Sequence, residues 1–265
     1  MNWLTSLPAV VLVVSWLFLA LLVAAVARVG VRALVPVAEQ DRVPQIAMPL
    51  MPTLGAAFAI FAALTLASEA GYLRAAEGLV SDEAAAASRL AWAATSPHVR
   101  SEPIHAALQD YLQTARVREW EAAAAASGGD AATAHAIARL ERSVRTEAAR
   151  PELGSPASTE LLVSLDSVTS SRRARLAAAS RDLPTLYVVT LVATGLALIV
   201  NAGALVFRSS LRTSLLVGGI ASVVGLSLGL LFALSAPWSG PFIVSGHPLD
   251  AVVEDLRSGF FDGGT

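Results

Sequence analysis

Residues 185–207 read "TLYVVTLVATGLALIVNAGALVF", a run that is long and apolar enough to cross a lipid bilayer. The run contains no Asp, Glu, Lys, Arg or His. At about 1.5 Å per residue, a helix of this length exceeds the hydrocarbon thickness of about 30 Å. Similar charge-free runs occur near 8–27, 47–67 and 213–236. The sequence therefore predicts four membrane-spanning helices, two on each side of a polar middle region.

The composition agrees with a membrane protein and excludes several other classes. Of the 265 residues, 55% are hydrophobic and 15% are charged, which is too apolar for an ordinary soluble domain. The net charge of −2 gives no indication of nucleic-acid binding. Cysteine is absent, so disulfides and thiolate metal sites are excluded. The histidines have no zinc-site spacing, and we expect neither a metal nor a cofactor.

The first apolar run could be read as a signal peptide, because Ala25-Val26-Ala27 resembles a cleavage site. However, no basic residue precedes the run, and it is long for a signal core. We therefore expect a retained helix. The chain then divides into spans one and two (1–67), a polar region (68–184), spans three and four (185–236) and a tail (237–265).

The polar region has the pattern of four helices, and no strand pattern is visible. The first continues from the second span to about residue 95, and the second runs from Ser101 to Gly128-Gly129. The third covers about 130–150 with Asp130 as its N-cap, and the fourth covers about 157–182. The predicted fold class is all-α: four transmembrane helices flanking a four-helix extramembrane bundle.

Four charged side chains occupy positions of these helices that should face the core. The three-four spacing of apolar residues places Glu83, Glu119, Arg172 and Arg175 in the seams of their helices. Counted from the membrane, their heights are about 22, 15, 18 and 13 Å. We expect a buried layer of ion pairs, because an unpaired buried carboxylate costs several kcal/mol. The alternative is that the alanine-rich seams are shallow and these side chains reach water.

Small residues mark one face of the fourth span. "GLSLG" at 225–229 matches the G-x-S-x-G motif of hydrolases, but that motif needs a strand–turn–helix setting and a histidine partner. No predicted span contains a histidine. The same segment is a G-x-x-x-G motif, which favours close helix packing. The stripe consists of Gly218, Ser222, Gly225 and Gly229.

Three further residues within the spans have two interpretations. Asn201 is the strongest polar group in a span, and either hydrogen-bonds a neighbouring helix or lines a pore. Phe58 and Phe61 lie one turn apart on the second span. They either pack in the core or against lipid, or form a hydrophobic constriction of a pore.

The chain leaves the fourth span through "SAPWSGPFIVSGHPL", residues 235–249. We expect Pro237 to end the span, Trp238 to lie at the membrane interface, and Gly240 to turn the chain into an extended piece containing Phe242. A helix then opens at Ser245 or Gly246, and its apolar stripe predicts docking on the protein itself. The alternative is a frayed tail.

Four segments in this order resemble the bestrophin-like bacterial membrane proteins of unknown function: "DEAAAASRL" (82–90), "YLQTARVREW" (111–120), "SRRARL" (171–176) and "PWSGPFIVSGHPL" (237–249). The resemblance extends distantly to bestrophin anion channels. It implies that six residues fill recurring positions of the family: Glu83, Tyr111, Glu119, Trp120, Arg172 and Arg175. It also implies a homo-oligomer with a pore-lining second span and a cytoplasmic helical domain and termini. The long ladder of pore aromatics and the acidic calcium clasp of bestrophins have no counterpart here.

The resemblance and the charge-free spans together favour a homo-oligomeric channel for small anions in the inner membrane, rather than an enzyme. The competing hypothesis is a non-conducting membrane scaffold or regulator whose helical domain binds a partner. The lipid bilayer is the common partner of both.

Overall fold

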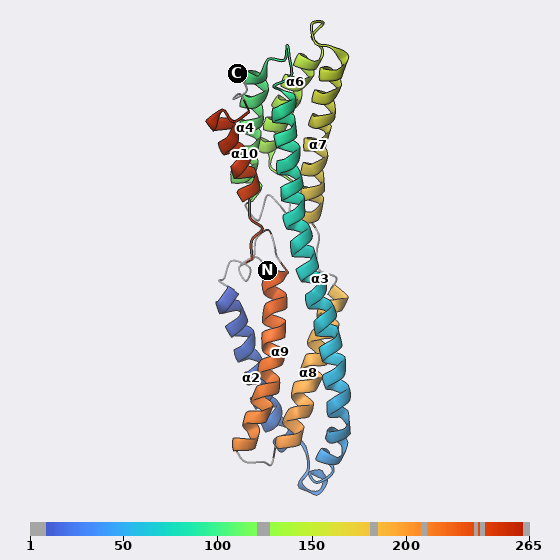
Figure 1. The fold of residues 1–265 in the computed structure, drawn as a ribbon. Helices are drawn as coiled ribbons and strands as arrows, with labels where there is room; N and C mark the ends of the chain where they lie inside the picture. Colours follow the sequence, from blue (N-terminus) through green and yellow to red (C-terminus); the bar gives the residue numbers. More distant parts are fainter. Residues whose placement is uncertain are drawn as a thin grey trace. The chain divides into compact units, whose positions relative to one another are not determined.

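The computed structural model describes residues 9–120, 128–180, 185–207, 211–235, 238 and 242–261. Within these residues the fold consists of eight α-helices and one short 3-10 turn, η1 (Val37–Glu39), without any strand (Figure 1). The predicted all-α class is therefore confirmed. The chain divides into two compact units, which are described in turn.

Unit 1 comprises Met1–Tyr72, Asp182–Ala236 and Gly240–Phe242. Its helices are α2 (Ala9–Leu34), the part of α3 (Val43–Ala93) up to Tyr72, α8 (Thr185–Val206) and α9 (Leu211–Leu234). Each of the four is long and apolar enough to cross a bilayer, as expected from the sequence. Helix α2 packs against both α8 and α9, which also contact each other.

Glycines let α9 lie directly against the backbone of α2. A Cβ at Gly225 would meet the Leu17 Cα at 2.8 Å, and one at Gly229 would meet the Val13 Cα at 2.8 Å. Gly218, by contrast, has its nearest neighbour, Leu21, at 3.9 Å. The Ser222 hydroxyl donates to the Gly218 carbonyl within its own helix, at 2.8 Å. The two C-terminal members of the stripe therefore provide the close contact, and Gly218 lies beside open space.

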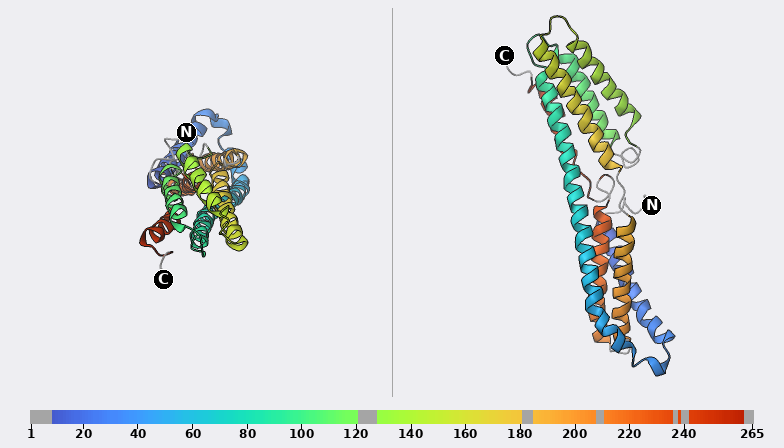
Figure 2. Two further views of the ribbon diagram at one scale, coloured as in Figure 1. Left: turned by 90° about the horizontal axis from the view of Figure 1, so that it is seen from above. Right: turned by 90° about the vertical axis from the view of Figure 1, so that its right-hand side faces the viewer.

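Unit 2 comprises Leu73–Arg181, Pro237–Ser239 and Ile243–Thr265. It contains the rest of α3, together with α4 (Ser101–Arg118), α6 (Ala131–Ala148), α7 (Ser155–Ala179) and α10 (His247–Ser258). Figure 2 shows α4, α6 and α7 running alongside the second part of α3. Its core is built from small and aliphatic side chains such as Val80, Leu90, Leu108, Leu140 and Leu161.

Helix boundaries follow the sequence signals, with one exception. Asp130 caps α6 by accepting hydrogen bonds from the backbone N–H of Ala132 (2.8 Å) and Thr133 (3.1 Å). Helix α4, expected to reach Gly128, ends instead at Arg118, with Glu119 as its C-cap. The buried side chain of Glu119 contacts two arginines of α7 at this point. Residues 121–127 lie outside the described part of the chain.

The C-terminal helix docks on the protein, as its apolar stripe predicted. Helix α10 packs against α4 and buries Leu249, Val252 and Val253. Gly246 is its N-cap, and a Cβ there would meet the Arg116 side chain at 2.3 Å. Trp238 is buried in the core of unit 2, and its position at the membrane interface stays a prediction. Phe242 is partly exposed, and Pro237 and Gly240 lie outside the described residues.

Candidate functional site

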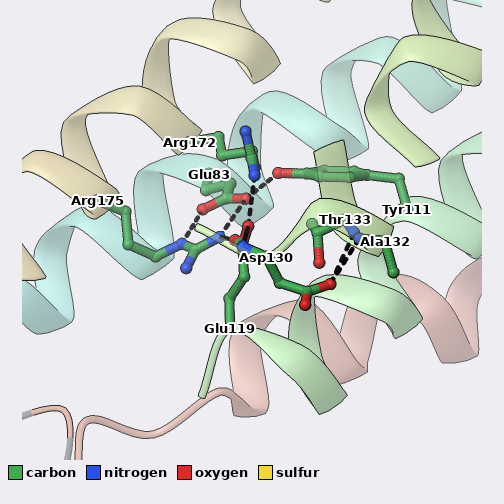
Figure 3. Close-up of polar contacts among 8 residues, drawn as sticks. All are labelled: Glu83, Tyr111, Glu119, Asp130, Ala132, Thr133, Arg172 and Arg175. Atoms are coloured by element: carbon green, nitrogen blue, oxygen red, sulfur yellow. Dashed lines mark hydrogen bonds and ion pairs between the residues drawn. The ribbon is translucent and has the colours of Figure 1, made fainter. Parts of the chain in front are cut away.

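The four charged residues identified from the seams lie together in unit 2, contributed by three helices (Figure 3). Glu83 comes from α3, Glu119 from the end of α4, and Arg172 and Arg175 from α7. We call these four residues the charge layer. The side chains of Glu83 and Glu119 are fully buried, and those of Arg175 and Arg172 are 1% and 12% exposed. Water therefore has little access to any of them.

Arg175 is the centre of the charge layer. Its Nε lies 2.5 Å from the Glu83 Oε2, and its Nη2 lies 2.7 Å from the Glu119 Oε2. A second contact joins Nη2 to the Glu83 Oε1 at 3.3 Å. Arg172 donates through Nη2 to the other oxygen of Glu119. The two negative and two positive charges cancel, so the layer is neutral although it is buried.

The Tyr111 hydroxyl completes the coordination of Glu83 by donating to its Oε1. Burial, together with the negative charge of Glu83, raises the pKa of Tyr111 well above its ordinary value. Arg175 behaves as a permanent cation, because the attraction of Glu83 outweighs burial and raises its pKa. The buried tyrosine is consequently a neutral hydrogen-bond donor to Glu83.

Trp120 links the charge layer to the C-terminal segment. The guanidinium of Arg175 lies over the Trp120 ring at 4.9 Å, a favourable cation–π contact. The indole Nε1 donates to the Val244 carbonyl at 2.9 Å, and the ring packs edge-on against Trp238 at 6.0 Å. On the α6 side, the backbone N–H of Asp130 approaches Glu119 at 3.5 Å. Helices α3, α4, α6 and α7 and the C-terminal segment therefore meet at this point.

The geometry favours a structural role for the charge layer over a catalytic one. Both carboxylates accept from arginine, so neither is available to take a proton from a substrate. Among the described residues, no group of three His, Asp or Glu side chains could hold a metal ion. What the layer can do is fix the relative positions of α3 and α7, because breaking a buried pair leaves an uncompensated charge.

A further buried acid of unit 2, Glu147, was not predicted from the sequence. It accepts from the backbone N–H of Arg100 (2.8 Å) and pairs with the side chains of Arg100 (3.0 Å) and Arg150 (2.5 Å). Burial acts to raise its pKa, but these hydrogen bonds outweigh it and lower the pKa below 4.5. The sequence did contain the pattern that places Glu147 in the core, because Glu147 follows Leu140 and Val144 on the buried face of α6.

The candidate pore residues of unit 1 lie in different environments. Phe58 is buried against Gly195 of α8, where an added Cβ would meet the phenyl ring at 3.2 Å. Phe61 is 37% exposed and lines a small cavity with Leu64. The Asn201 side chain donates to the Ala47 carbonyl at 2.9 Å, which joins α8 to α3. Phe58 and Asn201 thus make contacts inside the chain, and only Phe61 presents a partly open aromatic surface.

Comparison with known proteins connects this architecture to one family. The sequence profile of the Bestrophin-like domain matches residues 18–249. No curated protein is detectably similar in sequence. Among solved structures, a bacterial bestrophin homologue from Klebsiella pneumoniae, crystallised as a point mutant, matches with a TM-score of 0.68 and 14% identity. The match covers 95% of this chain and 99% of the homologue.

Two other crystal structures show the same fold. One is described only as a membrane protein variant, with a TM-score of 0.69 at 14% identity, over 95% of this chain and 98% of that one. The other is a second point mutant of the Klebsiella homologue, with a TM-score of 0.68 at 14% identity, over 92% and 99%. The profile match extends over most of the sequence, begins within the first candidate span, and includes the other three spans and the charge layer. The chain is therefore a membrane protein of the Bestrophin-like family.

Proposed function

We propose that this protein is a homo-oligomeric channel that passes small anions across the inner membrane. The observation that carries the proposal is a Bestrophin-like chain whose spans have long charge-free stretches, such as 43–67 and 185–206. Proton-coupled transport needs ionisable groups within the spans. A hydrophobic constriction needs none, because it gates by excluding water.

Unit 1 alone leaves much apolar surface uncovered, which supports assembly with further copies. Leu64 and Val223 are well exposed. A cavity of about 580 Å³ opens between α3, α8 and α9, with Gly55, Phe58 and Val223 in its wall. Within a bilayer, lipid or a second copy must cover this face. The proposal assigns it to the neighbouring subunit.

In this proposal Phe61 contributes to the constriction, while Phe58 supports it from the core of unit 1. The helical domain and both termini lie in the cytoplasm, as in the bestrophins that the chain resembles. Within unit 2, the charge layer holds the second part of α3 in a fixed position relative to α7. No enzymatic step is proposed, because the two acids of the charge layer are engaged by arginines.

One observation favours the competing function of a scaffold that binds a partner. Trp92 and Phe260 are 50% and 56% exposed, and they stack edge-to-face with their centroids 5.7 Å apart. Exposed aromatic pairs of this kind are common in protein interfaces. A scaffold would use this patch without conducting ions.

The test is chloride flux into liposomes containing the purified oligomer, whose mass is first measured by mass photometry. We expect Phe61→Ala to raise the flux several-fold, since a smaller side chain widens an apolar constriction. The matched control is Phe18→Ala, which removes an exposed phenylalanine from α2. A monomeric protein, or an assembled oligomer without chloride flux, would exclude the channel and leave the scaffold.

A further inference from the structure

A cavity of about 390 Å³ lies in unit 1 where the last turns of α2 and α8 meet the first turns of α9. Most of its wall is apolar and includes Leu21, Ala25, Val29 and Phe207. Among the described residues, two arginines, Arg28 and Arg32, also line the cavity. Small-molecule sites commonly have volumes of about 300–1,000 Å³, apolar walls and a few polar groups. The proposed ion pathway does not use this cavity.

The two arginines lie at the depth where lipid head groups begin. Helix α2 has no charged residue from Ala9 to Ala27, a stretch of about 28 Å at 1.5 Å per residue. Because this matches the hydrocarbon thickness of about 30 Å, Arg28 falls at the edge of the apolar layer. Arg32 follows four residues later on the same face of the helix. The apolar wall of the cavity therefore extends into the membrane, while the charges of Arg28 and Arg32 lie at the membrane surface.

The side chains around the cavity are arranged to leave it open. Gly218 of α9 has only Leu21 within 4 Å of an added Cβ, so no side chain from this position fills the space. At Gly203, α8 lies against the backbone of α2, with the Arg28 nitrogen 3.3 Å from an added Cβ. The close contact at Gly203 fixes the helix that carries both arginines. Arg32 is exposed and makes no hydrogen bond or ion pair with any described residue, whereas Arg28 already interacts within the chain.

We propose that this cavity binds an anionic phospholipid. The phosphate of the head group lies between Arg28 and Arg32, and one acyl chain fills the apolar space between α2, α8 and α9. Guanidinium groups bind phosphate through paired, charge-assisted hydrogen bonds. Basic pockets between spans are a known way of recognising acidic head groups. A zwitterionic lipid offers the same phosphate, but its ammonium group offsets the attraction, so the site selects for net negative charge.

The bound lipid would join the three helices that form the cavity, and it should therefore stabilise the folded chain. A ligand that binds only the folded state raises stability with its concentration. The stabilisation should be specific for the combination of an anionic head and an acyl chain. Inorganic phosphate supplies only the charge, and phosphatidylcholine supplies the chains without net charge.

The experiment measures the melting temperature of the full-length protein in detergent with added lipid, and the retained lipid by native mass spectrometry. The probes are phosphatidylglycerol, phosphatidylcholine with the same acyl chains, and inorganic phosphate. Of these three probes, we expect only phosphatidylglycerol to raise the melting temperature and to remain bound. The double variant Arg28→Gln/Arg32→Gln should weaken its binding at least about tenfold.

Two further variants separate the site from general effects. Arg42→Gln removes an exposed arginine that lies between α2 and α3 outside the cavity wall, and it should leave phosphatidylglycerol binding unchanged. Gly218→Leu fills the cavity without touching either charge and should reduce binding. Equal stabilisation by the two phospholipids, or unchanged binding in the double variant, would overturn the proposal. Stabilisation by inorganic phosphate alone, to the same extent, would also overturn it and indicate a site for free anions.

Discussion

The charge layer makes a quantitative prediction about paired substitutions. Arg175→Met leaves two buried carboxylates against the single cation Arg172, and Glu83→Gln leaves two arginines against Glu119 alone. Each single variant therefore buries one uncompensated charge, which costs about 3–5 kcal/mol. The double variant Glu83→Gln/Arg175→Met keeps the Arg172–Glu119 pair, so the layer is neutral again.

Because neutrality is restored, the double variant should lose clearly less stability than the two single variants together, by about 1–3 kcal/mol. For a chain of this size, a loss of 3 kcal/mol lowers the melting temperature by roughly 6–12 °C. The assay is thermal unfolding of the four proteins in detergent. Asp110→Asn is the matched control, because its pair with Arg139 is about half exposed and such pairs contribute about 0–1 kcal/mol. The reasoning would be refuted if the stability losses of the single variants added up in the double variant. It would also be refuted if the single variants were no less stable than the Asp110→Asn control.

Three further predictions concern other contacts. Glu147→Gln should lower the free energy of unfolding by about 1–2 kcal/mol near neutral pH. Because the pKa of Glu147 is lowered in the folded protein, this contribution should disappear from unfolding curves as the pH falls below 4.5. A constant difference between wild type and variant from pH 7 to pH 3 would contradict this. The pKa of Tyr111 is raised by folding, so the stability of the protein should decline as the pH rises above about 10. The stability of the Tyr111→Phe variant should decline less over the same pH range. Parallel stability curves for wild type and variant would contradict the assignment. Gly225→Val should lower the free energy of unfolding in detergent by about 1–3 kcal/mol, because it forces α2 and α9 apart. The control Gly219→Val should lower it little, because no atom lies within 4 Å of an added Cβ there. Equal losses of stability in the two variants would contradict the close packing.

The spacing of apolar residues was sufficient to find the charge layer. A glutamate or arginine at a seam position must be paired if the seam is buried, and the heights along the helices placed the four side chains at similar levels. The same test on the third polar helix would have found Glu147, which follows Leu140 and Val144 on the buried face. The role of Tyr111 was harder to predict, because a tyrosine in a seam is already consistent with apolar packing.

Other features depend on tertiary contacts that periodicity does not contain. The sequence pattern predicted a helix as far as Gly128, whereas α4 ends at Arg118. Glu119, which follows, contacts α7, and residues 121–127 lie outside the described part of the chain. Trp238 follows directly after a span, where aromatic residues favour the membrane interface, but this position does not reveal that its ring packs on Trp120. Similarly, nothing local distinguishes Phe58 from Phe61. Phe58 is the one that faces Gly195 of α8, where the absence of a Cβ leaves room for its ring. Helix propensity and residue type predicted the elements, whereas their packing partners depend on long-range contacts.

The central claim, that the protein is an anion channel, is tested most directly by the reversal potential of the purified oligomer in planar bilayers. With a tenfold gradient of potassium chloride across the bilayer, the account predicts a current that reverses near the chloride equilibrium potential. Phe61→Ala should increase that current without moving the reversal potential. A current that reverses near the potassium equilibrium potential, or no current at any voltage from an assembled oligomer, would contradict the account.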